Sequence, residues 1–142
     1  MLGTGLGSIV RVLHKRGYDP HFTLVEKNST ILQWAMDFFR YGSPDAKVEP
    51  VCADAMAYME INTTKYDLIF VDVFMGRVVP DFVTSPGFLK SCRDSLSPGG
   101  RLAFNYIIND NDKWESTKQI FSETFPRHEI VDYRINRVFI TA

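Results

Sequence analysis

The first seven residues constrain the fold of this chain more than any other stretch. They contain three alternating glycines, Gly3, Gly5 and Gly7, and an amphipathic segment starts directly after them. Glycine is favoured where the backbone needs a positive φ or where a ligand lies too close for a Cβ. A helix that follows such a turn points its free N–H groups back toward it, which suits a polar or anionic ligand. The opening therefore predicts a ligand-binding loop, with a plain glycine-rich turn as the alternative.

A carboxylate supports the ligand-binding interpretation. The strand-like run 22–25 ends at Glu26, which lies 19 residues after Gly7. In dinucleotide-binding folds an acid about 20 residues past the glycine loop reaches the ribose hydroxyls. The order of glycine turn, helix, strand and acid predicts a βαβ unit that binds a nucleoside.

Composition excludes several classes of protein. The chain has 142 residues, is 45% hydrophobic and carries a net charge of −1. This balance predicts a globular protein without the basic surface that nucleic-acid binding requires. No apolar run is long enough to span a membrane, and the chain opens on its glycine turn instead of a signal peptide. Cys52 and Cys92 are expected to be reduced thiols of a cytoplasmic protein.

Strand-like and helix-like segments alternate along the rest of the chain. We expect helices at 8–16, 29–40, 84–96 and 110–125, a helical turn at 55–59, a break at 42–44, and strands at 21–25, 47–52, 66–74, 101–108, 127–133 and 136–141. This order predicts a single α/β domain over residues 1–142, with a Rossmann-like open, mostly parallel sheet and helices on both faces. The last two strands should form an antiparallel pair. Only Met1 and Leu2 precede the glycine turn, so we expect the first strand to be largely missing and an N-terminal segment to be absent.

Four polar residues stand at the ends of predicted strands: Glu26, Asp54, Asp72 and Asn105. Ligands of open α/β sheets bind outside the carboxyl ends of the strands, so these side chains are candidates for a site. Asp54 is placed to accept a hydrogen bond from the amine of a base, or to cap the following helix. Asp72 ends an apolar strand, where an acid is either functional or held in a salt bridge. Asn105 fits a site residue and a core amide equally well.

Five motifs taken together resemble a known superfamily. They are Gly3-Thr4-Gly5-Leu6-Gly7-Ser8, Val25-Glu26, Ala53-Asp54-Ala55, Tyr66-Asp67-Leu68-Ile69-Phe70-Val71-Asp72 and Leu96-Ser97-Pro98-Gly99-Gly100. Their order is similar to that of the class I S-adenosylmethionine-dependent methyltransferases, and more narrowly to their spermidine-synthase-like branch. The resemblance implies a cofactor, S-adenosylmethionine or its decarboxylated form. The cofactor-binding residues that it implies are Gly3, Thr4, Gly5, Gly7, Glu26, Lys27, Asp54, Ala55 and Asp72.

The resemblance also assigns roles. The three glycines would approach the methionine portion of the cofactor, Glu26 the ribose, and Asp54 with Ala55 the adenine. Asp72 would face the reacting centre as the catalytic residue that orients or deprotonates the acceptor. The following loop would form the acceptor wall, with Phe74, Met75 and Phe82 as its apolar lining. Arg77 would anchor an acidic acceptor, unless it is an ordinary solvated charge.

One departure from the family separates three candidate functions. Aminopropyltransferases resemble this chain but carry a second acid three residues after the position of Asp72, where this sequence has Met75. The main expectation is therefore methyl transfer to an amine or hydroxyl of a small-molecule or protein acceptor. The alternatives are aminopropyl transfer from decarboxylated S-adenosylmethionine, as in polyamine biosynthesis, and a non-catalytic nucleoside-binding domain. We expect no metal, because the three histidines lack ligand spacing, and no membrane or nucleic-acid partner; a homodimer stays open.

Overall fold

The computed structural model describes residues 1–42 and 47–142, and its backbone forms two compact units, Met1–Ala55 and Met56–Ala142. Each unit has its own set of paired strands, β1-β2 in the first and β3-β4-β6-β5 in the second. Positions 43 and 44 of the expected helix break lie outside the described residues. The single-domain organisation stays a prediction.

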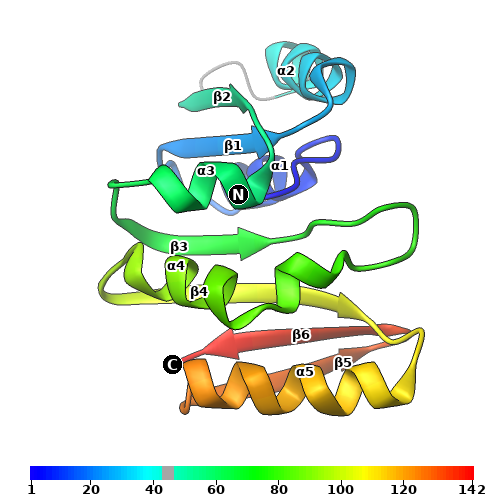
Figure 1. Ribbon diagram of the computed structural model, residues 1–142. Coiled ribbons are helices and arrows are strands. Elements are labelled where there is room, and N and C mark those ends of the chain that lie inside the picture. The colour runs from blue at the N-terminus through cyan, green and yellow to red at the C-terminus, as the bar shows by residue number, and fades with distance from the viewer. Residues whose placement is uncertain (43–46) are drawn as a thin grey trace. The chain divides into compact units, whose positions relative to one another are not determined.

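The first unit alternates helices and parallel strands. It contains α1 (Ser8–Lys15), β1 (Phe22–Glu26), α2 (Ser29–Gly42) and β2 (Val48–Cys52). The two strands pair in parallel, from Phe22 opposite Val48 to Glu26 opposite Cys52. Leu2 adds an isolated parallel bridge to Val25 on the way into the glycine loop. The carboxyl ends of β1 and β2 therefore lie side by side (Figure 1).

Both helices of this unit bury apolar side chains together with β1. The core consists of Val10, Leu24, Leu32, Ala35 and Phe39. Leu32, Ala35 and Phe39 recur at helical spacing along one face of α2. Trp34 falls on another face and is 59% exposed. In α1 the buried residue is Val10, whereas Val12 is exposed.

The second unit follows from α3, which begins at the last residue of the first unit. Its elements are α3 (Ala55–Ile61), β3 (Tyr66–Val71), the 3₁₀ helix η1 (Asp81–Thr84), α4 (Pro86–Asp94), β4 (Leu96–Ile107), α5 (Asn111–Thr124), β5 (His128–Tyr133) and β6 (Asn136–Thr141). Strands β3 and β4 are parallel, whereas β6 pairs antiparallel with both β4 and β5. The expected C-terminal antiparallel pair is confirmed. That β6 lies between β4 and β5 could not be read from the sequence.

Two expected boundaries are wrong at the start of β4. The helix expected at 84–96 ends at Asp94, and the strand expected at 101–108 begins at Leu96, so residues 97–100 belong to the strand. A register shift explains the difference, because Tyr66 pairs with Leu96 and Leu68 already pairs with Arg101. At Gly100 a Cβ would lie 2.8 Å from the carbonyl oxygen of Tyr66, so only glycine permits this close pairing.

Helices α4 and α5 lie in front of this sheet in Figure 1, and an aromatic cluster fills the space beneath α5. Phe104 of β4, Phe121 of α5 and Phe139 of β6 are fully buried. The Phe121 and Phe139 ring centroids are 4.3 Å apart, and Phe104 lies 5.7 Å and 5.6 Å from them. Trp114 stacks on Tyr106 at the border of the cluster. This burial fixes which face of β4 points to the helices.

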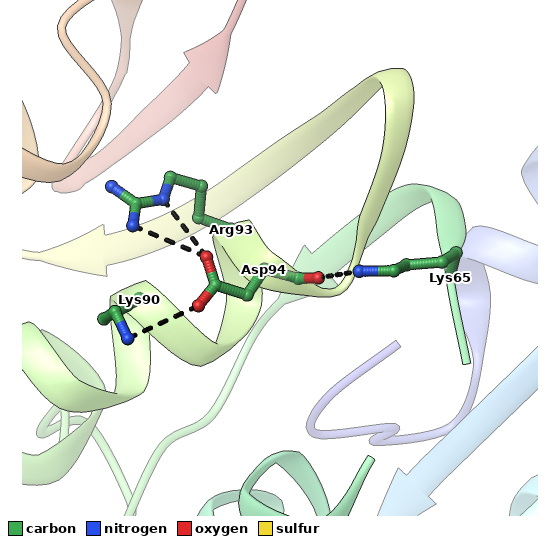
Figure 2. Close-up of polar contacts among 4 residues, drawn as sticks. All are labelled: Lys65, Lys90, Arg93 and Asp94. Carbon is green, nitrogen blue, oxygen red and sulfur yellow. Dashed lines mark hydrogen bonds and ion pairs between the residues drawn. The ribbon is translucent and has the colours of Figure 1, made fainter. Parts of the chain in front are cut away.

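Charged side chains close the carboxyl end of α4 (Figure 2). The Asp94 carboxylate lies 3.6 Å from the Lys90 ammonium and 3.4 Å from the Arg93 guanidinium. The Lys65 ammonium donates to the backbone carbonyl of Asp94, which ties the segment before β3 to the end of the helix. These side chains are 46% to 67% exposed, so each ion pair contributes at most about 1 kcal/mol.

No helix within the described residues is both long and apolar enough to cross a membrane.

Candidate functional site

The glycine loop is a chain of left-handed backbone conformations. Gly3, Gly5 and Gly7 have φ values of 77°, 50° and 67°, and the Gly7 amide donates to the Thr4 carbonyl at 2.8 Å. Gly5 and Gly7 differ in what surrounds them. A Cβ on Gly7 would lie 2.0 Å from the Phe39 ring. A Cβ on Gly5 would have no atom within 4 Å. Packing therefore requires glycine at position 7, and Gly5 is the open position that a ligand can approach.

The Glu26 carboxylate is held by backbone amides. The Thr4 amide donates to Glu26 Oε2 at 3.2 Å, and the Asn28 amide donates to Glu26 Oε1 at 2.9 Å. The first bond joins the glycine loop to the end of β1, as the sequence pattern predicts for a nucleoside site. Each carboxylate oxygen keeps acceptor capacity, which two adjacent ribose hydroxyls could use. Lys27, the next residue, is exposed.

Thr4 is an unusual residue of this loop. Its side chain is 2% exposed, and its hydroxyl oxygen makes no hydrogen bond. It is the buried side-chain polar atom without a partner among the described residues. Burying a hydroxyl without a partner costs about 1–3 kcal/mol. The fold alone therefore gives no reason for a hydroxyl at position 4.

Asp54 and Ala55 follow β2 and lie close to the end of β1. The Ala53 amide donates to the Glu26 carbonyl at 3.2 Å, which carries the chain past Glu26 before α3 begins. Asp54 is exposed and immediately precedes α3, while Ala55 is buried. The position fits both interpretations of Asp54, a base contact and a helix cap. The first unit thus brings Gly3, Thr4, Gly5, Glu26 and residues 53–55 to one end of its sheet.

Asp72 belongs to a second polar cluster, in the second unit. The Asn105 side-chain amide donates to Asp72 Oδ1 at 2.7 Å, and the Asn136 amide donates to Asn105 Oδ1 at 3.1 Å. The three residues come from the end of β3, from β4 and from the first position of β6. Asp72 is exposed and Asn105 and Asn136 are half buried. Asn105 is therefore a partner of Asp72 and not a core amide.

The loop after Asp72 turns back on itself. Met75 and Val78 exchange backbone hydrogen bonds of 2.8 Å and 3.2 Å around Gly76, whose φ is 65°. Met75 is 61% exposed, Arg77 is exposed, and the Arg77 carbonyl accepts a hydrogen bond from Asn109 at 2.8 Å. Phe74 is half buried. Phe82 packs edge-on against the buried Phe88 of α4, at 5.5 Å, which anchors the far end of the loop.

Thiols and metal ligands add no further centre in the part of the chain that the structure describes. Cys52 and Cys92 are both free, and burial raises the pKa of the Cys92 thiol to about 12. No group of three or more His, Cys, Asp or Glu side chains within residues 1–42 and 47–142 could hold a metal ion.

The sequence motifs do not indicate Asn136 or Asn28 as site residues. Asn136 starts a strand, and residues at strand starts were not considered as site candidates. The missing information was that β6 runs antiparallel to β4, because this places the start of β6 at the carboxyl end of β4. Asn28, by contrast, stands two residues after Glu26 and could have been found as a backbone partner of that carboxylate.

Comparisons with known proteins bear on these two clusters. The polyamine aminopropyltransferase of Chromobacterium violaceum is 30% identical over 109 residues, which cover 77% of this chain and 42% of the relative. That of Vibrio vulnificus is 29% identical over 137 residues, or 94% of this chain and 41% of the relative. The chain spans about two fifths of the length of these curated relatives. No protein-family model matches it.

Solved structures show the fold. Human methyltransferase-like protein 13 in complex with SAH superposes with a TM-score of 0.83 at 20% identity, covering 99% of this chain and 68% of that one. A probable spermidine synthase from Corynebacterium glutamicum gives 0.83 at 23%, covering 99% and 54%. A spermidine synthase in complex with the transition-state analogue AdoDATO gives 0.77 at 18%, covering 99% and 52%.

This chain has the class I methyltransferase-type fold. The Rossmann-like α/β fold predicted from the sequence is confirmed. The resemblance to the spermidine-synthase-like branch is confirmed as well, because the curated relatives are polyamine aminopropyltransferases. These relatives favour the aminopropyl alternative over the methyl transfer that was the main expectation. SAH and AdoDATO, the ligands of two of the solved proteins, agree with the cofactor class expected from the sequence.

Proposed function

We propose that this chain is the nucleoside-binding part of a transferase that moves an aminopropyl group from decarboxylated S-adenosylmethionine to an amine. The curated relatives described above are polyamine aminopropyltransferases, and they support this choice of reaction. The observation that carries the proposal is the bond between the Thr4 amide and the Glu26 carboxylate, which joins a glycine loop to an acid in the manner of a ribose site.

The first unit carries the residues that fit the cofactor. Glu26 would accept hydrogen bonds from the two ribose hydroxyls, and its oxygens are already oriented by the Thr4 and Asn28 amides. Gly5 leaves open space where any other residue would place a Cβ. Asp54 would accept from the adenine amine. Lys27 and Ala55 would flank the nucleoside, and Gly3 and Gly7 shape the loop that admits it.

The second unit carries the residues that fit the acceptor. When bound, the cofactor supplies a sulfonium-bound carbon that an amine can attack, breaking its C–S bond and leaving a neutral thioether. The attacking nitrogen must be unprotonated, and Asp72 is the group that would accept its proton. Such a displacement depends mainly on positioning, so few catalytic residues are needed. Phe74 and Met75 would contact the rest of the acceptor, a small polyamine-like molecule, whereas the cationic Arg77 would suit only an acidic acceptor.

Methyl transfer is the second candidate, and Met75 is the observation that favours it. The side chain is exposed and apolar at the position where the aminopropyltransferases resembled in sequence carry a second acid. A diamine acceptor has two cationic ends, and one carboxylate fits only one of them. An acceptor with a single amine or hydroxyl and an apolar body would suit Asp72 beside Met75 better.

Calorimetric titration with three ligands tests the proposal. We expect decarboxylated S-adenosylmethionine to bind more tightly than S-adenosylmethionine and S-adenosylhomocysteine. Glu26→Gln should weaken binding of the preferred ligand by roughly tenfold or more, because an amide cannot accept from the backbone and both hydroxyls at once. Glu49→Gln, which removes an exposed acid from β2 of the same unit, is the matched control and should bind as the unmodified chain does.

The outcomes separate the candidates. Preference for the two carboxylated ligands would replace aminopropyl transfer by methyl transfer. Absence of binding by all three would refute both transferase candidates. Equal affinity of the Glu26→Gln and unmodified proteins would remove Glu26 from the site while leaving the choice of reaction to the ligand series.

A further inference from the structure

The polar cluster of the second unit has a direction that the amides themselves define. A side-chain amide has one end that only donates and one that only accepts. The Asn136 amide donates to Asn105 Oδ1 at 3.1 Å, so the other end of the Asn105 amide must be its NH2 group. That group donates to Asp72 Oδ1 at 2.7 Å. If the Asn105 amide were reversed, its oxygen would face the carboxylate and its NH2 would face the Asn136 NH2.

We propose that Asn136 is a positioning residue that acts through Asn105 to hold the Asp72 carboxylate with Oδ1 occupied and Oδ2 presented to the acceptor amine. The inference rests on the proposed function, in which Asp72 accepts the proton of that amine. It adds Asn136 and a defined amide orientation, and neither follows from the motifs in the sequence.

The strand arrangement supports the proposal. Asn105 on β4 pairs with Val138 on β6, and Ile107 pairs with Asn136, so the two asparagines point to the same face of the sheet at neighbouring positions. The neighbours of Asn105 in β4, Phe104 and Tyr106, are buried on the opposite face, in the aromatic cluster. The aromatic core therefore fixes the strand whose alternate residue reaches Asp72. We call the hydrogen-bonded series Asn136, Asn105 and Asp72 the relay. It needs no movement of the backbone.

Burial adds to the argument. Asn105 and Asn136 are half buried, so water competes less for their amides than it does at the exposed Asp72. A carboxylate on an exposed strand end would otherwise sample several rotamers. A charge-assisted hydrogen bond at 2.7 Å restricts it to one of them.

The test uses two substitutions at position 136 and a charge-matched control. Asn136→Asp keeps the shape but can only accept, so it should pull the Asn105 NH2 away from Asp72. Asn136→Ala removes the donor without adding an acceptor. Asn111→Asp makes the same change of charge at an exposed position in the first turn of α5. We expect kcat to fall roughly tenfold in Asn136→Asp and less in Asn136→Ala, with KM for the cofactor unchanged and Asn111→Asp equal to wild type.

A double-mutant cycle and a spectroscopic measurement exclude a merely structural role. Once Asp72→Asn is present, Asn136→Asp should cause no further loss of kcat, since the relay no longer acts on a carboxylate. The side-chain amide NMR signals of Asn105 should shift in both Asp72→Asn and Asn136→Asp. Additive losses of kcat in the cycle would overturn the proposal. So would Asn105 amide chemical shifts that are unchanged in both substitutions.

The NMR signals also distinguish this inference from the proposed function. A wild-type protein that transfers no group to any amine refutes the proposed function. In that case the Asn105 signals still decide whether Asn136 sets the orientation of the Asn105 amide. If the Asn105 signals shift in Asn136→Asp while kcat is unchanged, the hydrogen bonds exist but do not position Asp72 for the reaction.

Discussion

At the scale of single residues, the glycines of the first loop do different work although they look alike in the sequence. All three have positive φ, which costs a residue with a Cβ about 1–2 kcal/mol. Gly7 also lies under an aromatic ring, since its position would place a Cβ 2.0 Å from Phe39. Gly5 faces open space. The loop therefore combines one glycine required by packing with one that leaves room for a ligand.

The two glycines should respond differently to alanine. Gly7→Ala should lower the free energy of unfolding by about 3 kcal/mol or more, because the methyl group clashes with the Phe39 ring in addition to the backbone strain. Gly5→Ala should cost only the strain, about 1–2 kcal/mol. Urea denaturation of both variants beside wild type measures the difference. A loss at Gly7 no larger than that at Gly5 would contradict the packing argument.

At the scale of elements, the β5–β6 hairpin decides where Asn136 lies. Tyr133 and Asn136 pair across its two-residue turn, and Arg134 occupies the first central position with a φ of 56°. Turns with positive φ at that position strongly favour glycine. Arg134 is the non-glycine residue with positive φ among those the structure describes, so the turn stores strain next to the relay.

Glycine at this turn should relieve the strain. Arg134→Gly is expected to raise the free energy of unfolding by about 0.5–1 kcal/mol, since the lost strain outweighs the greater chain entropy of glycine. The thermal midpoint should rise accordingly. Ile135→Gly, which places glycine at the neighbouring position without positive φ, is the control and should lower the midpoint. A lower midpoint for Arg134→Gly would show that the turn is not strained.

At the scale of the whole molecule, two compact units each build a sheet with its own core, and the two cysteines report on them separately. Cys52 ends β2 of the first unit and is exposed, whereas Cys92 lies in α4 of the second unit with no exposed surface. Burial of Cys92 raises the pKa of its thiol from 9.0 to about 12. Between about pH 9 and pH 12 the Cys92 thiol therefore stays protonated in the native protein, whereas it loses its proton in the unfolded chain.

This proton makes stability depend on pH with a definite sign. Because the native pKa is the higher one, the contribution of Cys92 is fully present below pH 9 and is lost as pH rises toward 12. The difference in unfolding free energy between wild type and Cys92→Ala should shift against wild type by about 1 kcal/mol from pH 7 to pH 10. Urea denaturation of both proteins at the two pH values measures it. A pH-independent difference would mean that the thiol ionises equally in both states.

Thiol labelling offers a second check on the same cysteine. At pH 8 a thiol reagent should modify Cys52 at once and Cys92 only when the second unit unfolds, because the thiolate is the reactive form and Cys92 is both protonated and enclosed. Rapid modification of Cys92 in the native protein would contradict its burial.

By itself the sequence determined the class of fold and most elements, and it predicted Glu26 and Asp72 as site residues. Local signals were enough for these: alternating apolar patterns for the strands, glycine and proline at the turns, and an acid at a set distance from a glycine loop. Glu26 was predicted because it ends a strand 19 residues after Gly7. Asp72 was found because an acid rarely ends an apolar strand, although its role remains a prediction.

Only the tertiary structure decided the rest, because it depends on contacts between segments distant in the chain. The glycine and proline stretch at 97–100 belongs to β4 because Tyr66 and Leu96 pair across a register shift, and no local pattern contains that pairing. Trp34 is exposed because the inward face of α2 is set by Leu32, Ala35 and Phe39. Asn136 reaches Asn105 because β6 runs antiparallel beside β4. Strand order places polar side chains next to one another, and the order of strands is a property of the folded sheet.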